Sequence, residues 1–440
     1  MSIFKTLVKA NRDIKLLWFS VFLRLMAYGA SNIVLVLYLK ALGISESLIG
    51  IFMTLTLIGD TAISYLLTWY ADGLGRRYVM IAGSLLMVLS GLVFANFNQF
   101  YVLLSAAIFG VISPSGDEVG PFKSIEESTM AHLTILKDRP DVYALHWLLG
   151  TAGASIGSLI TGILLGRLLE NGYTNVEAYR VIFYIYAGIG LLKLVLMLFL
   201  SDNCELNGAH VETHHQNTEE DPLLPNGVSS DREDQQGDTK KSSSLSRETV
   251  GILIKLLSVF MLDSLGSGFM SSSWVVYYFK THFLITSTTL GVLFFLTNVV
   301  NSISALPSSV LAKKLGPIKA TLAVQVPSAI FLVITPFIQQ FLGAAFVIIL
   351  FYSTSAMDVV PRQVLLTGLI KPDELTKCMG IVNIGKTFAR CIGPIATGKL
   401  ATHGKLWISY LISGGLIFSA DVLLAILFYG IDEKILETHS

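Results

Sequence analysis

The chain alternates between long apolar runs and short polar intervals. The apolar runs are about 20 residues long, the length at which a helix crosses roughly 30 Å of hydrocarbon. They predict twelve spanning helices, at residues 16–39, 47–69, 79–95, 101–122, 143–166, 180–200, 251–279, 288–311, 317–338, 342–366, 379–399 and 407–429. The pattern therefore predicts an all-α polytopic membrane protein.

The longest polar interval divides these spans into six and six. It covers residues 202–248, is low in aromatics and has the composition of a disordered segment. We therefore expect an N-terminal six-helix bundle at 1–201, a disordered central loop at 202–248 and a C-terminal six-helix bundle at 249–440.

Composition supports the membrane assignment and excludes several other classes. Of the 440 residues, 53% are hydrophobic and only 14% are charged, whereas a soluble protein carries about a quarter. Net charge is zero, so nothing suggests nucleic acid. The three cysteines show no metal or disulfide spacing. We find no phosphate loop, zinc motif or nucleophile with a credible base, and so expect no enzyme activity, no cofactor and no ATP-driven transport.

The basic residues between spans predict the orientation. Most lie in intervals that fall on one side of the membrane, with fewer opposite (Lys40, Lys280, Lys405). The intervals on the basic side contain Lys5, Lys9, Arg12, Lys15, Arg76, Arg77, Lys137, Arg139, Lys240, Lys241, Arg247, Lys313 and Lys314. The termini and the central loop should therefore be cytoplasmic, with the first span retained rather than cleaved.

The two sets of six spans resemble each other in sequence. Five short matches occur in the same order at an offset near 240: "SVF" at Ser20 and Ser258, "YLK" at Tyr38 with "YFK" at Tyr278, "LG" at Leu74 and Leu315, "EVGP" at Glu118 with "DVVP" at Asp358, and "GSLITG" at Gly157 with "GPIATG" at Gly393. Parallel six-span repeats are the plan of transporters that bind substrate between their halves.

The interval after the second span carries a family motif. The stretch "WYADGLGRRYVM" contains Asp72, Gly75, Arg76 and Arg77, and resembles the signature loop of the major facilitator superfamily, although Thr68 stands where a glycine is expected. The resemblance implies the twelve-helix major facilitator fold and secondary transport by alternating access. It also implies that this loop acts as a conformational latch against the opposite half.

A second resemblance lies in the fifth span. Gly153, Gly157 and Gly162 resemble the glycine-rich signature of drug/proton antiporters of the same superfamily, with Ser158 in place of its proline and Thr161 in place of a glycine. Small residues at this spacing also let helices approach closely, whatever is transported. We favour the packing interpretation and keep the antiporter as the alternative.

Ionisable and polar side chains within the spans are the candidate site, because a charge at membrane depth is costly unless it is paired or hydrated. The resemblance implies that spans one, four, seven and ten line a central cavity. The candidate substrate-binding residues are Arg24, Tyr28, Asn32, Glu118, His146, Asp263, Trp274, Asp358, Arg362 and Lys386.

Two ion pairs are expected between these spans. Arg24 should pair with Asp117 or Glu118, and Asp263 with Arg362, either as partners exchanged during transport or as static clamps. Candidates for proton coupling are Glu118, Asp263 and Asp60.

Two other charged regions of the sequence are expected to play no part in the site. Residues 123–127 should be the solvated end of span four, and Lys193 should extend along a peripheral helix towards water.

The central loop contains a candidate sorting signal. Glu219, Leu223 and Leu224 have the spacing of an acidic dileucine sorting signal, which adaptors read in proteins bound for lysosomes or vacuoles. The sequence thus favours a vacuolar or lysosomal membrane, with the plasma membrane as the alternative.

The functional expectation is a monomeric secondary active transporter that moves a small polar or charged organic solute across the bilayer, with proton coupling as a further hypothesis. The alternatives are a drug/proton-type efflux antiporter and a non-transporting membrane sensor on the same fold.

Overall fold

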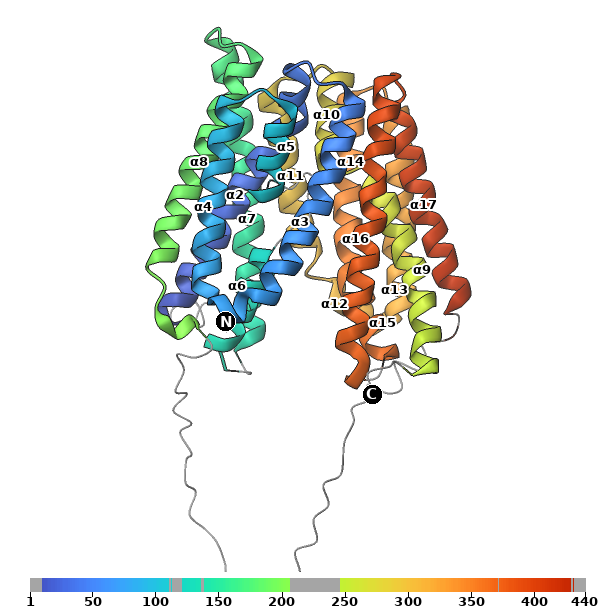
Figure 1. Cartoon of the computed structure of the whole chain (residues 1–440). Coiled ribbons are helices and arrows are strands. Elements are labelled where there is room, and N and C mark those ends of the chain that lie inside the picture. The colour runs from blue at the N-terminus through green and yellow to red at the C-terminus, as the bar shows by residue number, and fades with distance from the viewer. Residues whose placement is uncertain are drawn as a thin grey trace, which may run out of the picture.

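The helices form two bundles that stand side by side (Figure 1). The computed structural model describes residues 10–110, 112, 121–135, 138–205, 246–370, 372–428 and 430, and no strand occurs among them. This confirms the all-α prediction for these residues. The boundaries expected for the two bundles and the central loop stay predictions.

The first bundle contains the elements up to Cys204 and the second those from Arg247. The first comprises α2 (Arg12–Ala41), α3 (Glu46–Leu74), α4 (Arg76–Asn96), α5 (Phe100–Phe109), α6 (Pro121–Leu133), α7 (Arg139–Glu170), α8 (Asn175–Leu198) and the 3₁₀ turn η1 (Asp202–Cys204). The second comprises α9 (Arg247–Phe269), α10 (Ser272–His282), α11 (Ser287–Ser304), α12 (Ser308–Leu315), α13 (Pro317–Ile334), η3 (Thr335–Phe337), α14 (Phe341–Ser355), η4 (Ala356–Asp358), α15 (Val359–Leu369), α16 (Pro372–Thr402) and α17 (Leu406–Leu427).

Ten stretches within the described residues are long and apolar enough to cross a membrane. The fourth and eleventh predicted spans are not among them. The fourth corresponds to the short apolar helix α5 followed by α6, and the predicted end at residue 122 is wrong because α6 continues to Leu133. The eleventh corresponds to α16, whose 31 residues include Lys386 and Arg390.

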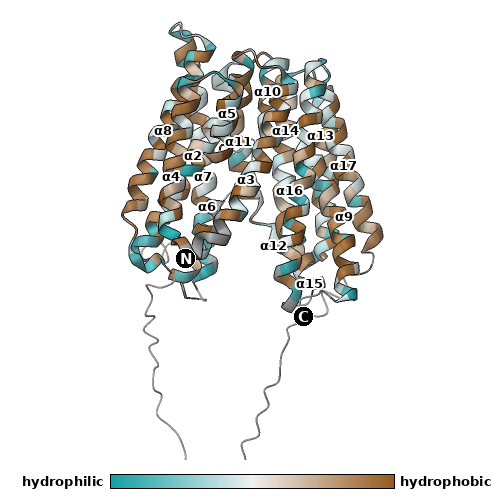
Figure 2. Cartoon of the chain, in the orientation of Figure 1, coloured by the Kyte–Doolittle hydropathy of each residue, from teal (hydrophilic) through white to brown (hydrophobic). Residues whose placement is uncertain are grey.

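The outer faces of the bundles are apolar, as a bilayer requires. Figure 2 shows brown along the outer helices and teal mainly at the helix ends. Large side chains such as Ile254, Phe388 and Ile426 are 62%, 66% and 69% exposed. In water such a surface would be unfavourable, whereas lipid chains solvate it at no cost.

The two bundles touch at the end where α7 and α16 finish and diverge towards the other end (Figure 1). The contacts between bundles are made by α7 with α11, by α3 with α16, and by α2 with α10. In the first two pairs the C-terminal part of one helix meets the N-terminal part of the other, so the contacts lie near one membrane surface.

Aromatic side chains fill each bundle near this closed end. Tyr38 donates to the Phe94 carbonyl at 2.7 Å, and its ring lies 5.1 Å from that of Phe183. At the repeat-equivalent position, the ring of Tyr278 lies 4.8 Å from that of Tyr410. The sequence match between Tyr38 and Tyr278 therefore corresponds to a shared structural role.

Glycines set the closest helix contacts inside each bundle. A Cβ placed on Gly153 would lie 2.2 Å from the Phe22 carbonyl oxygen, and one on Gly157 would lie 2.0 Å from that of Met26. Gly393, the counterpart of Gly157, would come within 2.1 Å of the backbone of Gly268. The glycine-rich stretch of α7 thus packs against α2, and close packing alone accounts for these glycines.

Glycines also meet between the bundles. A Cβ on Gly162 of α7 would lie 2.5 Å from the Cα of Gly291 on α11, and one on Gly398 of α16 would lie 2.9 Å from the Cα of Gly50 on α3. At both contacts, the backbone of a helix in one bundle therefore lies directly against the backbone of a helix in the other.

Replacing Gly157 by alanine should destabilise the first bundle by about 1–3 kcal/mol, because the new methyl group meets backbone that cannot turn aside. Thermal unfolding of the purified protein in detergent measures this. Gly188→Ala in α8 is the matched control, since nothing lies within 4 Å of its Cβ position. Equal melting temperatures for the two variants would contradict the packing role.

Candidate functional site

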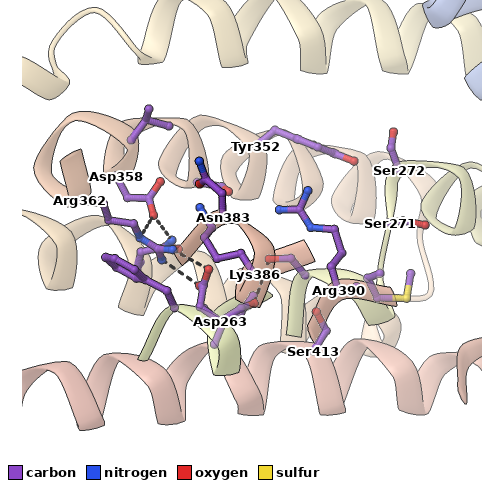
Figure 3. Close-up of a pocket in the computed structure, with 18 of the residues that line it drawn as sticks. Asp263, Ser271, Ser272, Tyr352, Asp358, Arg362, Asn383, Lys386, Arg390 and Ser413 are labelled. Carbon is purple, nitrogen blue, oxygen red and sulfur yellow. Dashed lines mark hydrogen bonds and ion pairs between the residues drawn. The ribbon is translucent and has the colours of Figure 1, made fainter. Parts of the chain in front are cut away.

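A cavity of about 470 Å³ lies at membrane depth, mainly in the second bundle. Helices α9 to α11 and α13 to α17 form its walls, and Leu57 of α3 is the contribution of the first bundle. Its charged lining residues are Asp263, Asp358, Arg362, Lys386 and Arg390. The first four are among the candidates predicted from the sequence, and Figure 3 shows how they converge.

Arg362 bonds to two carboxylates in this cavity. Its two terminal nitrogens donate to Asp263 at 2.6 and 2.8 Å, and its Nε pairs with Asp358, one helical turn earlier. The expected pair between Asp263 and Arg362 is present. Asp358 also accepts a hydrogen bond from the amide of Gln325 at 2.5 Å, a residue that sequence reasoning did not single out.

Two further cations extend from α16 into the same space. Lys386 and Arg390 are one turn apart, and both point into the cavity (Figure 3). The Lys386 ammonium lies 5.9 Å from the centre of the Phe260 ring, and the Arg362 guanidinium lies 5.8 Å from it. At these distances the ring face helps to hold both cations.

A second charged cluster lies inside the first bundle, around Glu126. This carboxylate is fully buried and pairs with Arg24 at 2.7 Å and with Lys193 and His146 at 3.3 and 3.4 Å. It also accepts a hydrogen bond from Ser20 at 3.3 Å. Four helices, α2, α6, α7 and α8, therefore converge on one acidic group.

The Glu126 cluster corrects two expectations. Residues 123–127 were expected to be solvated, but Glu126 is buried because α6 continues into the bundle. Lys193 was expected to reach water, but it is fully buried against Glu126. Arg24 donates to Glu126 at 2.7 Å. The expected pair of Arg24 with Asp117 or Glu118 stays a prediction, because those two acidic residues lie outside the described part of the chain.

Other predicted site residues lie apart from the cavity. Trp274 is fully buried and packs edge-on against Tyr277, and it does not line the cavity. His146 belongs to the Glu126 cluster. Tyr28 is partly buried on α2, one turn before Asn32, which reaches across to the second bundle.

Two buried carboxyl groups stand outside both clusters of direct ion pairs. Asp60 on α3 is 1% exposed, and within the described residues neither of its oxygens has a hydrogen-bond partner. Asp421 on α17 is 2% exposed, with one oxygen lacking such a partner there. Sequence reasoning identified Asp60 and missed Asp421, although a lone acid in an apolar run was signal enough to find it.

The signature loop makes a tight turn between α3 and α4. Gly75 has φ +96° and precedes α4, and its counterpart Gly316 has φ +84° and precedes α13. The backbone N–H groups of Arg76 and Arg77 donate to the Glu205 carboxylate at 2.7 and 3.0 Å. An acid at a helix N-terminus in this way satisfies donors that the helix leaves open.

The side chains of this loop bond within their own bundle. Arg77 pairs with Asp202 at 2.8 Å, and Arg76 donates to the Ser128 carbonyl at 3.2 Å. The side chain of Asp72, like the sorting residues Glu219, Leu223 and Leu224, lies outside the described part. The expected latch against the opposite bundle stays a prediction. It applies to a conformation in which the bundles meet at the end that carries this loop.

The closed end is held by polar contacts between bundles. Asn32 donates to the Ser272 hydroxyl at 2.7 Å and accepts from that of Ser273 at 2.8 Å. Glu46 accepts from the Tyr277 hydroxyl at 2.9 Å and pairs with Lys40 at 2.6 Å. The contacts of Asn32 and Glu46 with the second bundle would have to break for this end to open, whereas the Lys40–Glu46 pair lies within the first bundle.

Replacing Asn32 by alanine should raise the population open at this end, because two hydrogen bonds of about 1 kcal/mol each are lost from the closed form alone. Spin labels on the exposed positions Asn171 and His403, one in each bundle at the closed end, report the change as a longer distance.

The labels require a background without the three native cysteines, which are all buried. Asn98→Ala is the matched control, because Asn98 bonds to Arg180 within its own bundle. An unchanged distance distribution in Asn32→Ala would show that this contact does not hold the end closed.

Two helical bundles that meet at one end, with a charged cavity at membrane depth, have the architecture of a secondary membrane transporter. Residues 17–222 and 256–439 match the family model described as Major Facilitator Superfamily. The chain therefore belongs to the Major Facilitator Superfamily. Family and fold indicate a transporter rather than an enzyme.

Relatives extend over the whole chain or over part of it. The "Uncharacterized membrane protein YJR124C" of Saccharomyces cerevisiae is 51% identical over 430 residues, which cover 97% of this chain and 96% of that protein. The quinolone resistance protein NorA of Staphylococcus aureus is 26% identical over 190 residues, or 43% of this chain and 45% of NorA.

Solved transporters share the fold. The D-xylose–proton symporter aligns with a TM-score of 0.72 and 17% identity over 94% of this chain and 97% of its own. A bacterial homolog of the human lysosomal transporter Spinster, inward-facing and unoccupied, aligns with a TM-score of 0.68 and 12% identity over 97% of both chains. Identities this low establish the fold alone.

Proposed function

We propose that the protein is a secondary active transporter that moves a small polar or charged organic solute by alternating access. The observation that carries the proposal is the cavity of about 470 Å³ and its five charged lining residues. Its size suits a small molecule. Charges at membrane depth are retained where they serve a binding site or a conformational change.

The same lining argues against an apolar drug as the main substrate. Besides the five charges, amide side chains line the cavity at Asn298, Asn301, Gln325, Gln363 and Asn383. A purely apolar solute would displace water from this polar lining and offer its amide and charged groups no hydrogen bonds in return. The partial similarity to NorA keeps a drug/proton-type antiporter as the second candidate.

Proton coupling belongs to the proposal, with Asp60, Asp263 and Glu118 as the acids. Asp60 is the best placed of the described residues, because its carboxyl is buried without a hydrogen-bond partner among them. An ionised acid there would be unpaired in the membrane, whereas a protonated one carries no charge. Asp263 would exchange its bond to Arg362 for a proton or solute during the cycle.

We further propose that the protein lies in a vacuolar or lysosomal membrane with both termini in the cytoplasm. The excess of basic residues on one side and the acidic dileucine spacing at Glu219, Leu223 and Leu224 support this. In that orientation the bundles diverge towards the cytoplasm, so the conformation is inward-open. Localisation of a fluorescent fusion, with and without Leu223→Ala and Leu224→Ala, tests whether this sorting signal directs the protein to that membrane.

Flux through sealed vesicles tests transport itself. Untargeted metabolite comparison of knockout and overexpressing cells nominates solutes, and uptake of each into vesicles holding the purified protein is then measured with and without a pH gradient. Protein-dependent uptake that the gradient accelerates supports a coupled carrier. Binding without translocation would instead indicate a sensor.

A further inference from the structure

The charged side chains of the cavity fall into two groups on different helices. Asp263, Asp358 and Arg362 form one group, in which three guanidinium nitrogens already bond to protein carboxylates. Arg362 therefore has little hydrogen-bonding capacity left for a solute. Its role in this state is to pair with two acids that would otherwise be buried without a counter-charge.

The second group is cationic and lies on α16. Lys386 and Arg390 project into the cavity from one face of this helix (Figure 3). Asn383, one turn before Lys386, lines the cavity as well. Two cations and an amide thus follow one another along the wall, next to the Arg362 group.

The lining as a whole is positive. It carries three cations, Arg362, Lys386 and Arg390, against two carboxylates, Asp263 and Asp358. Asp421 is buried and does not line the cavity. Fields inside a low-dielectric cleft are stronger than in water, so one excess positive charge favours anions over cations.

We infer that the solute is an organic anion whose carboxylate or phosphate group binds between Lys386 and Arg390. Guanidinium groups bind both kinds of acid through two parallel hydrogen bonds, and an ammonium adds a compact charge. The amides at Asn298, Asn301 and Asn383 and the Tyr352 hydroxyl are placed to bond the rest of a polar solute. This inference rests on the proposed transport function.

The test uses proteoliposomes of the full-length protein loaded with a defined mixture. The mixture contains succinate and citrate as carboxylates, glucose 6-phosphate as a phosphate ester, xylose as a neutral solute and choline as a cation. Mass spectrometry then measures which solutes leave faster than from protein-free vesicles. The two anionic arms distinguish carboxylate from phosphate recognition.

The expected result is faster loss of one or more anions, with xylose and choline unchanged. Lys386→Gln and Arg390→Gln should each reduce that loss at least about tenfold, the effect of one charge-assisted bond. Lys399→Gln is the matched control, because Lys399 lies on the same helix but is exposed and outside the cavity. It should transport like the native protein.

Other outcomes separate the two hypotheses. Loss of xylose or choline without anions would overturn the anion assignment and leave transport standing. Anion loss that Lys386→Gln and Arg390→Gln do not change would place the acid elsewhere and overturn it too. If no solute in the mixture leaves faster than from protein-free vesicles, the anion assignment is overturned. Transport itself is then still tested with the solutes that the metabolite comparison nominates.

Discussion

Glu126→Gln should destabilise the protein by about 3–5 kcal/mol, the cost of removing one partner from a buried ion cluster. Glu126 is the carboxylate to which Arg24, Lys193 and His146 are all bonded, and both Glu126 and Lys193 are fully buried. Glutamine keeps the shape and removes the charge, so the cations lose their shared counter-charge in the bilayer interior.

Thermal unfolding and size-exclusion profiles in detergent measure the loss. Glu127→Gln is the matched control, because Glu127 is adjacent in sequence but only partly buried. This substitution should change the free energy of unfolding by less than about 0.5 kcal/mol. Adding Lys193→Met to Glu126→Gln should restore part of the stability by removing one stranded cation. Native stability in Glu126→Gln would refute the role given to this cluster.

Arg362→Gln should have the second largest effect, with a loss of about 3 kcal/mol in stability and of most transport. The side chains of Asp263 and Asp358 are 10% and 9% exposed, and both pair with Arg362. Without it, two carboxylates face each other at membrane depth. Transport should fall further than stability does, because the cavity lining also loses its one excess positive charge and no longer favours an anion.

Arg362→Lys separates charge from geometry. A lysine restores one positive charge but cannot bond both carboxylates in the same fork, so stability should recover more than transport. Gln363→Ala, at the next position and exposed, serves as the stability control. If Arg362→Gln melts like the native protein, the two carboxylates are not held by Arg362.

Much of the architecture follows from hydropathy and the repeat. Apolar runs of membrane-spanning length predict the helices, and the match of Tyr38 with Tyr278 and of Gly75 with Gly316 corresponds to equivalent structural positions. Span four was the exception. Its charges and helix breakers end the apolar run, yet α6 continues to Leu133 because its polar residue Glu126 finds buried partners on other helices.

Side-chain pairing was predictable only in part. Asp263 and Arg362 could be paired because the family resemblance implies that spans seven and ten line one cavity. Lys193 and Glu126 could not, since hydropathy gives the depth of a charge in the membrane and not the direction in which its helix faces. Gly190, one turn before Lys193, packs closely against α4, and such tertiary contacts set the direction in which α8 faces.

The glycine contacts between the bundles have a mechanical consequence. Ordinary helix pairs interlock through side-chain ridges and grooves, which resist rolling. Gly162 against Gly291 and Gly50 against Gly398 place nearly smooth backbone surfaces together. In the alternating access proposed here, one bundle would therefore meet little side-chain resistance if it rolled on the other at these two points, while the buried charges would move with their own bundle.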